Sequence, residues 1–316
     1  MTEGGGTAGD AVTAPPTRSR ARRLAGLAAG LAILAFLAYG LVDSWSVVRD
    51  YDWQLRPVPL AGAVLVLAAF YATSGAAYAR IVGLLQPQGP PTVVTISVWA
   101  RSLLGRYVPG NVLMVLGRVV LAYERGTSRR VTLAATVYEQ ILALVVAAVA
   151  AVAFVALSGE VGGRWGLALL ALVPLGFAAL HPRVFGPVTS WLLTRLGREP
   201  LPVLLSARGL AGLCLWYAAA ATLLGLGVWL SLYAAVGSQA GGPAYVGAAF
   251  LLSFVVSTVA FIFPSGLGVR EGVFAAALTT NVPGGVAVAL AVGARLLLTL
   301  VELAFVGAMV LWDRRR

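Results

Sequence analysis

Long apolar runs separated by short polar segments dominate this chain, and their spacing predicts membrane-spanning helices. A helix needs about 20 consecutive apolar residues to cross the hydrocarbon core of a bilayer. Runs that reach or approach this length cover residues 24–42, 57–85, 131–157, 165–180, 210–236 and 286–312. We therefore predict about six full spans.

Two further apolar stretches, residues 92–124 and 245–280, are interrupted near their middle by helix-breaking residues. The breaking residues are Pro109 and Gly110 in the first stretch, and Pro264, Gly266 and Gly268 in the second. Irregular backbone at membrane depth is tolerated only where protein buries it or a polar cavity receives it. We expect each stretch to form a re-entrant helical hairpin that lines a cavity.

The charges of the connecting segments predict the orientation of the helices. Arginine-rich segments are 18–23, 125–130, 183–208 and 314–316, whereas 43–56 is acidic and aromatic and 281–285 carries no basic residue. Cytoplasmic loops of membrane proteins carry the excess of basic residues. Both termini are therefore expected in the cytoplasm.

This orientation divides the chain into two repeats with the same order of span, span, hairpin and span. The repeats cover residues 24–157 and 165–312, joined by an external loop at 158–164 and flanked by basic cytoplasmic tails at 1–23, predicted to be disordered, and 313–316. Because the second repeat starts on the opposite side, the sequence predicts an all-α polytopic bundle with an inverted repeat. The alternative, in which both broken stretches are complete kinked spans, gives eight crossings and stays open.

Composition agrees with an integral membrane protein and excludes several other classes. The chain is 59% hydrophobic and only 11% charged, with a mean hydropathy of +0.89, whereas soluble domains carry about 25% charged residues. The chain contains no lysine, so arginine supplies all of the positive charge behind the net charge of +11. We assign this charge to cytoplasmic loops rather than to nucleic-acid binding. With one cysteine, one histidine and no nucleotide-binding motif, we expect no metal site and no cofactor.

Charged residues within the apolar stretches point to a binding site for an anion. Candidate side chains are Arg118, Glu139, Arg270, Glu271, Arg295 and Glu302. Arg295 and Glu302 are seven residues apart and share one helix face. A guanidinium group holds a phosphate with two donors, and helix N-termini after the two breaks would add backbone donors. We expect these residues and the breaking residues to bind an anionic lipid head group; internal Arg–Glu pairing that only stabilises the bundle remains the alternative.

Two motifs resemble a known family. They are residues 104–110 (LGRYVPG), followed by Gly117-Arg118, and residues 263–271 (FPSGLGVRE). The chain is similar here to the transmembrane region of lysylphosphatidylglycerol synthase/flippase proteins and their stand-alone relatives, which include archaeal proteins of dolichol-linked glycosylation. The resemblance covers most of residues 24–312. It implies a two-repeat membrane domain with re-entrant helices that moves lipid between leaflets.

The resemblance and the charge pattern together predict a flippase-like translocase in the cell membrane. Its cargo would be an anionic phospholipid or a polyprenyl-phosphate-linked lipid, with a glycosyltransferase or lipid-modifying enzyme as a candidate partner. No soluble aminoacyl-transfer domain follows before Arg316, so lysyl transfer is not expected. A non-transporting membrane subunit or regulator is the alternative, and a lipid-phosphate enzyme is disfavoured by the lack of His, Asp or metal ligands at depth.

Overall fold

The computed structural model describes residues 45–107, 112–157, 171, 173–176, 178–195, 204–259 and 268–315, and every regular element in these ranges is helical. Four helices are long and apolar enough to cross a membrane. They are α3 (Pro57–Leu85), α6 (Arg129–Leu157), α9 (Ala207–Val236) and α12 (Gly284–Arg314). The prediction of an all-helical membrane bundle is confirmed. The predicted span 24–42 lies outside the described residues, as does half of the span 165–180.

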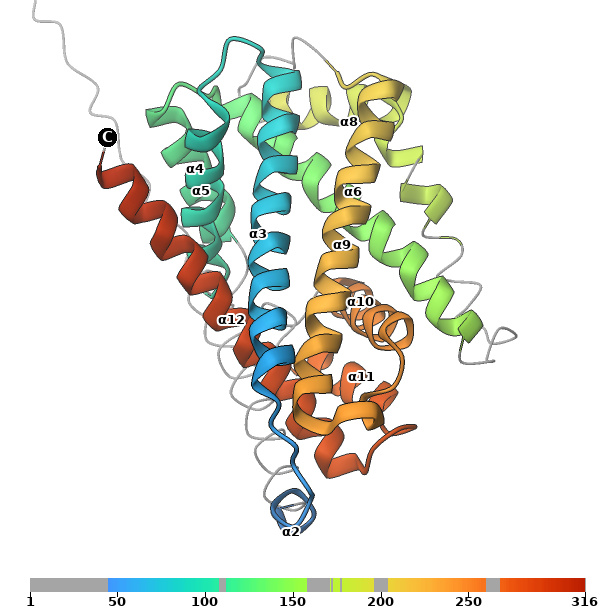
Figure 1. The fold of residues 1–316 in the computed structure, drawn as a ribbon. Coiled ribbons are helices and arrows are strands. Elements are labelled where there is room, and N and C mark those ends of the chain that lie inside the picture. Colours follow the sequence, from blue (N-terminus) through green and yellow to red (C-terminus); the bar gives the residue numbers. More distant parts are fainter. Residues whose placement is uncertain are drawn as a thin grey trace, which may run out of the picture.

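The four long helices begin and end close to the predicted residues because the sequence marks their ends. Pro57 opens α3, where the missing N–H of proline costs nothing. The hydroxyl of Ser206 caps α9 by accepting the N–H of Gly209 at 3.1 Å, and Gly237 ends that helix with a φ of +62°. At 1.5 Å per residue each helix is about 45 Å long, which exceeds the hydrocarbon thickness and favours tilting. Figure 1 shows α6 and α12 inclined relative to α3 and α9.

The two broken stretches form pairs of short helices. The first contains α4 (Thr92–Leu103), the 3-10 turn η1 (Leu104–Tyr107) and α5 (Val112–Glu124); the second contains α10 (Pro243–Val259) and α11 (Val269–Leu278). Within each stretch the two helices pack against each other. Helices α4 and α5 lie toward the end of the bundle where α12 ends, and α10 and α11 lie toward the opposite end (Figure 1). Pro109, Gly110, Pro264 and Gly266 lie outside the described residues.

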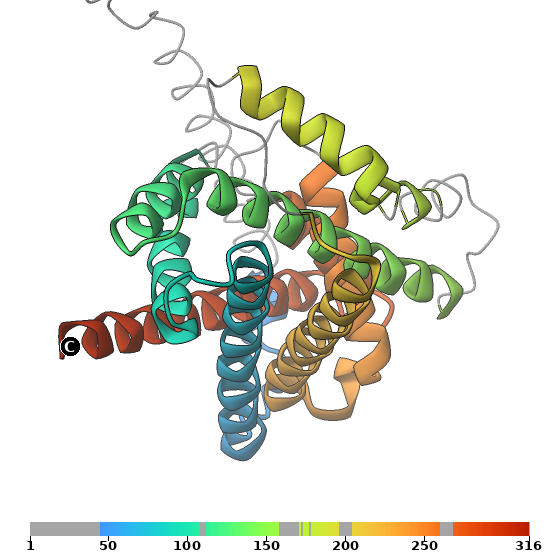
Figure 2. The ribbon, with the colours of Figure 1, turned by 90° about the horizontal axis from the view of Figure 1, so that it is seen from above.

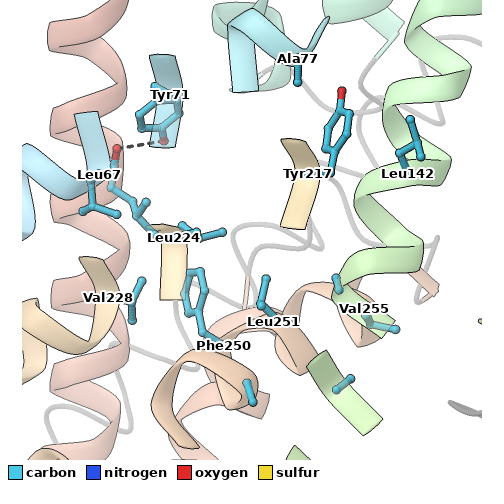
Figure 3. Packing of buried hydrophobic residues seen from close by; sticks show 14 of the residues in the cluster. Leu67, Tyr71, Ala77, Leu142, Tyr217, Leu224, Val228, Phe250, Leu251 and Val255 are labelled. Atoms are coloured by element: carbon cyan, nitrogen blue, oxygen red, sulfur yellow. Dashed lines mark hydrogen bonds between the residues drawn. The ribbon is translucent and has the colours of Figure 1, made fainter. Parts of the chain in front are cut away.

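The interior is built around α3 and α9, which pack along each other. Helix α12 contacts both α4 and α11, and α6 contacts both α5 and α10. Leu67 of α3, Leu224 of α9 and Phe250 of α10 are buried in the resulting apolar core (Figure 3). Each of α6 and α12 thus connects one short helix of the first stretch with one of the second.

Two further helices, α2 (Trp45–Arg49) and α8 (Pro182–Arg195), lie outside the group of packed helices described above. Helix α8 lies at the periphery of the bundle in Figure 2. The ring nitrogen Nδ1 of His181 accepts the N–H of Arg183 at 3.2 Å and caps the helix, and Pro182 is tolerated in the first turn. Phe185 stacks on Tyr138 of α6, with 3.8 Å between ring centroids, and holds α8 against the bundle.

A glycine pair sets the distance between α9 and α10. A Cβ atom added at Gly225 would lie 2.9 Å from the Cα of Gly247. We therefore expect Gly225→Ala to lower the free energy of unfolding by about 1–3 kcal/mol, because the two backbones would have to separate. Thermal unfolding in detergent measures this. Gly212→Ala on the same helix is the control, since nothing lies within 4 Å of its added Cβ. Equal unfolding temperatures for the two variants would contradict the expectation.

Candidate anion-binding site

The described residues contain two groups of charged side chains that are buried or partly buried among the helices. The first, which we call the closed pair, is Arg118 with Glu139. The second, which we call the arginine cluster, consists of Arg106, Arg270, Glu271, Arg295 and Glu302. The two groups differ in how completely their hydrogen-bonding atoms are used.

The closed pair joins α5 to α6. Arg118 is 0% exposed; its guanidinium donates to one carboxylate oxygen of Glu139, and its Nε donates to the hydroxyl of Ser102 at 2.9 Å. The other oxygen of Glu139 accepts the indole N–H of Trp99 at 2.6 Å. The guanidinium also lies over the ring of Tyr78, 4.7 Å from its centroid. Both carboxylate oxygens have donors, so this geometry accounts for the pair as a link between helices. That Arg118 and Glu139 bind substrate stays a prediction.

In the arginine cluster, Glu302 of α12 is the most buried carboxylate, with 2% exposure. Its Oε2 accepts hydrogen bonds from Arg106 and from the hydroxyl of Tyr71, both at 3.0 Å. About two turns before Glu302 on the same helix, Arg295 Nε lies 3.5 Å from Oε1 of Glu271 on α11. Arg295 and Glu302 were predicted to share one face of their helix. They contact different partners, so α12 is tied to both broken stretches.

Arg270 occupies a different environment from the other two arginines of the cluster. Its guanidinium lies over the rings of Phe250 and Phe254 on α10, at 4.4 and 5.4 Å from their centroids. Its Nε is buried and has no hydrogen-bond partner among the described residues. Arg295 and Arg106 both lie within electrostatic range of it. With three arginines and two glutamates, the cluster carries one excess positive charge.

The start of α11 adds a second feature that favours an anion. Gly268 has a φ of +80°, and its N–H donates to Oε2 of Glu271 at 2.6 Å, so Glu271 caps its own helix. Arg270 is the second residue of α11, where the positive end of the helix dipole disfavours a cation. An anionic oxygen bound there would interact favourably with both the dipole and the guanidinium.

Sequence reasoning missed three residues that shape this site: Tyr71, Phe250 and Phe254. The two phenylalanines are four residues apart on one helix, a spacing that places them on the same face. A tyrosine in an apolar span gives only a weak signal, because its partner on α12 is more than 200 residues away in the chain.

An open hollow of about 350 Å³ lies elsewhere, where α3 ends and α6 begins. Leu85, Gln86, Tyr123, Gly126, Thr127, Ser128, Arg130 and Val131 line it. None of these residues belongs to the arginine cluster, so this hollow and the charge cluster are separate features.

These helices and their buried charges define a polytopic helical membrane protein. Comparison of the sequence with models of known protein families, and with curated proteins, finds no match. The resemblance to the lysylphosphatidylglycerol synthase/flippase family, which rests on the two motifs and on the helix that contains Arg295, stays a prediction.

Proposed function

We propose that this protein is a translocase that moves an anionic lipid, either a phospholipid or a polyprenyl-phosphate-linked lipid, between the leaflets of the cell membrane. The observation that carries the proposal is the buried Nε of Arg270, which has no partner among the described residues, in a cluster with one excess positive charge. A guanidinium group at membrane depth is costly unless an anion or water compensates it. A lipid phosphate supplies that anion and fits the two-donor geometry of arginine.

The proposed architecture is an inverted repeat of six spans and two re-entrant hairpins, with both termini in the cytoplasm. The packing of the helices supports this architecture. When α3, α4, α5 and α6 are exchanged, in that order, with α9, α10, α11 and α12, each pair of these helices that is in contact becomes another pair that is also in contact. The contact of α6 with α10 becomes that of α12 with α4, and the contact of α5 with α6 becomes that of α11 with α12.

The buried ion pairs follow the same exchange. Arg118 of α5 pairs with Glu139 of α6, and Glu271 of α11 pairs with Arg295 of α12. The two pairs occupy corresponding helices with their charges reversed. Inverted repeats of this kind place the substrate site near the bilayer midplane, between the two halves.

The cluster suggests how a head group is handled. A phosphate that enters accepts hydrogen bonds from Arg270 and competes with Glu302 for Arg106 and with Glu271 for Arg295. Because those two ion pairs hold α12 to the two broken stretches, a bound anion weakens the contacts that fix the helices relative to one another. Ligand binding and helix movement are thereby coupled.

Leaflet transfer in reconstituted liposomes tests the proposal. Labelled phosphatidylglycerol or polyprenyl phosphate is placed in one leaflet, and the purified protein is expected to transfer it faster than protein-free liposomes do, and faster than labelled phosphatidylcholine. Binding without transfer would favour the alternative of a non-transporting subunit or regulator. Chemical turnover of the head group would favour an enzyme.

A further inference from the structure

Asp313, near the end of α12, is hydrogen-bonded to residues at the ends of α4 and α5, the two helices of the first broken stretch. Its Oδ2 accepts a hydrogen bond from Arg101 in the last turn of α4 at 2.7 Å. Arg125, directly after α5, donates to Oδ1 and Oδ2, also at 2.7 Å each. These hydrogen bonds raise the pKa of the Arg125 guanidinium. The carboxylate side chain is 9% exposed, so this is a more enclosed contact than an ordinary surface ion pair.

Arg125 is held in place by the end of its own helix. The N–H of Thr127 bonds to the carbonyl of Ala122, the N–H of Gly126 bonds to that of Tyr123, and Gly126 has a φ of +88°. This is the hydrogen-bond pattern of a glycine-terminated helix. The side chain of Gln86, at the end of α3, donates to Gly126 O at 2.8 Å and accepts the N–H of Ser128 at 3.0 Å. The loop that presents Arg125 is therefore fixed to α3.

Asp313 lies on the same stripe of α12 as the arginine cluster. Arg295, Glu302 and Asp313 are separated by seven and eleven residues, and both spacings return a helix to nearly the same face. Glu302 pairs with Arg106 of the first broken stretch, and Asp313 pairs with Arg101 and Arg125 about three turns further on. The C-terminal half of α12 is thus joined by ion pairs to three arginines that lie within the first broken stretch or directly after it.

We propose that Asp313, with Arg101 and Arg125, is a latch that closes the route to the arginine cluster at the end of the bundle where α12 ends. The inference rests on the proposed function only in that a translocase must open this end. In the structure the latch is closed. Opening separates α12 from α4 and α5, and releasing the three charge-assisted hydrogen bonds of Asp313 is the step that permits it.

The test measures how readily a buried position beneath the latch reacts, and it uses no lipid. The native cysteine is removed by Cys214→Ala, and Val306→Cys places a thiol on α12 between Glu302 and Asp313, at a residue that is 4% exposed. In lipid nanodiscs, Asp313→Asn is expected to speed modification of this thiol by a polar maleimide about fivefold, in line with the loss of partly exposed ion pairs. Asp313→Glu, which keeps the carboxylate, is expected to react at nearly the rate of the parent.

A second thiol separates opening of the latch from loosening of the whole fold. Val246 of α10 is 0% exposed, and α10 lies toward the end of the bundle opposite the one where α12 ends (Figure 1). The modification rate of Val246→Cys is expected not to change with Asp313→Asn. Equal acceleration at both thiols, or no acceleration at Val306→Cys, would overturn the latch. If Asp313→Asn fails to fold, Arg125→Gln removes two of the three hydrogen bonds and gives the same test. A protein that moves no lipid but shows the selective acceleration would contradict the proposed cargo and leave the latch standing.

Discussion

Replacing Arg270 by glutamine is expected to reduce transfer of an anionic lipid by at least about tenfold. Hydrogen bonds to charged groups contribute about 1.5–3 kcal/mol, and each 1.4 kcal/mol corresponds to about a factor of ten. Glutamine keeps a polar side chain at this position but removes the charge that lies over Phe250 and Phe254 and the two-donor geometry. Initial transfer rates of labelled phosphatidylglycerol in proteoliposomes measure the effect.

Two variants serve as controls for Arg270→Gln. Arg270→Lys keeps the charge without the planar pair of donors, so an intermediate rate is expected. Arg80→Gln removes an exposed arginine of α3 that lies outside the cluster, and it is expected to leave the rate unchanged. Wild-type transfer by Arg270→Gln would remove Arg270 from the route, and equal losses in Arg270→Gln and Arg80→Gln would point to a general effect of net charge.

The largest effect on stability is expected at the closed pair. Arg118→Met leaves the Glu139 carboxylate buried with the indole N–H of Trp99 and without a compensating charge. Removing one partner of a buried ion pair destabilises proteins by about 3–5 kcal/mol. Unfolding in detergent, followed by tryptophan fluorescence or by a thermal shift, measures the change.

The double variant Arg118→Met/Glu139→Leu distinguishes a buried pair from simple loss of packing. Replacing both charges by apolar side chains of similar volume is often neutral, so the double variant is expected to recover most of the stability that Arg118→Met loses. If both proteins unfold at the same temperature, the lost stability comes from the missing arginine side chain and not from an unpaired charge.

The sequence predicted the long helices well because their ends carry strong local signals. Pro57 and the turn at Gln86 bound α3 at the residues expected, and Pro283-Gly284 marks the start of α12 to within two residues. The start of α8 was missed because a histidine cap before Pro182 is a weak pattern in a single sequence. Helix boundaries set by long-range packing leave no such local mark.

The composition of the site was only partly predictable. The positions of Arg270, Glu271, Arg295 and Glu302 in apolar stretches marked them as candidates, because charge at membrane depth is rare. Their pairing was not predictable, since Arg106–Glu302 and Glu271–Arg295 depend on which helices meet. Asp313 was expected to be part of a cytoplasmic tail. Its contacts with Arg101 and Arg125 bring together segments about 190–210 residues apart, a separation that loop charge cannot resolve.

The proposed function requires a bundle interior that receives a negatively charged head group. Native mass spectrometry of the protein, purified from membranes that contain phosphatidylglycerol and phosphatidylcholine in equal amounts, tests this most directly. We predict that the wild-type protein retains phosphatidylglycerol in preference to phosphatidylcholine and that Arg270→Gln loses the preference. Equal retention of the two lipids by the wild-type protein would contradict the account.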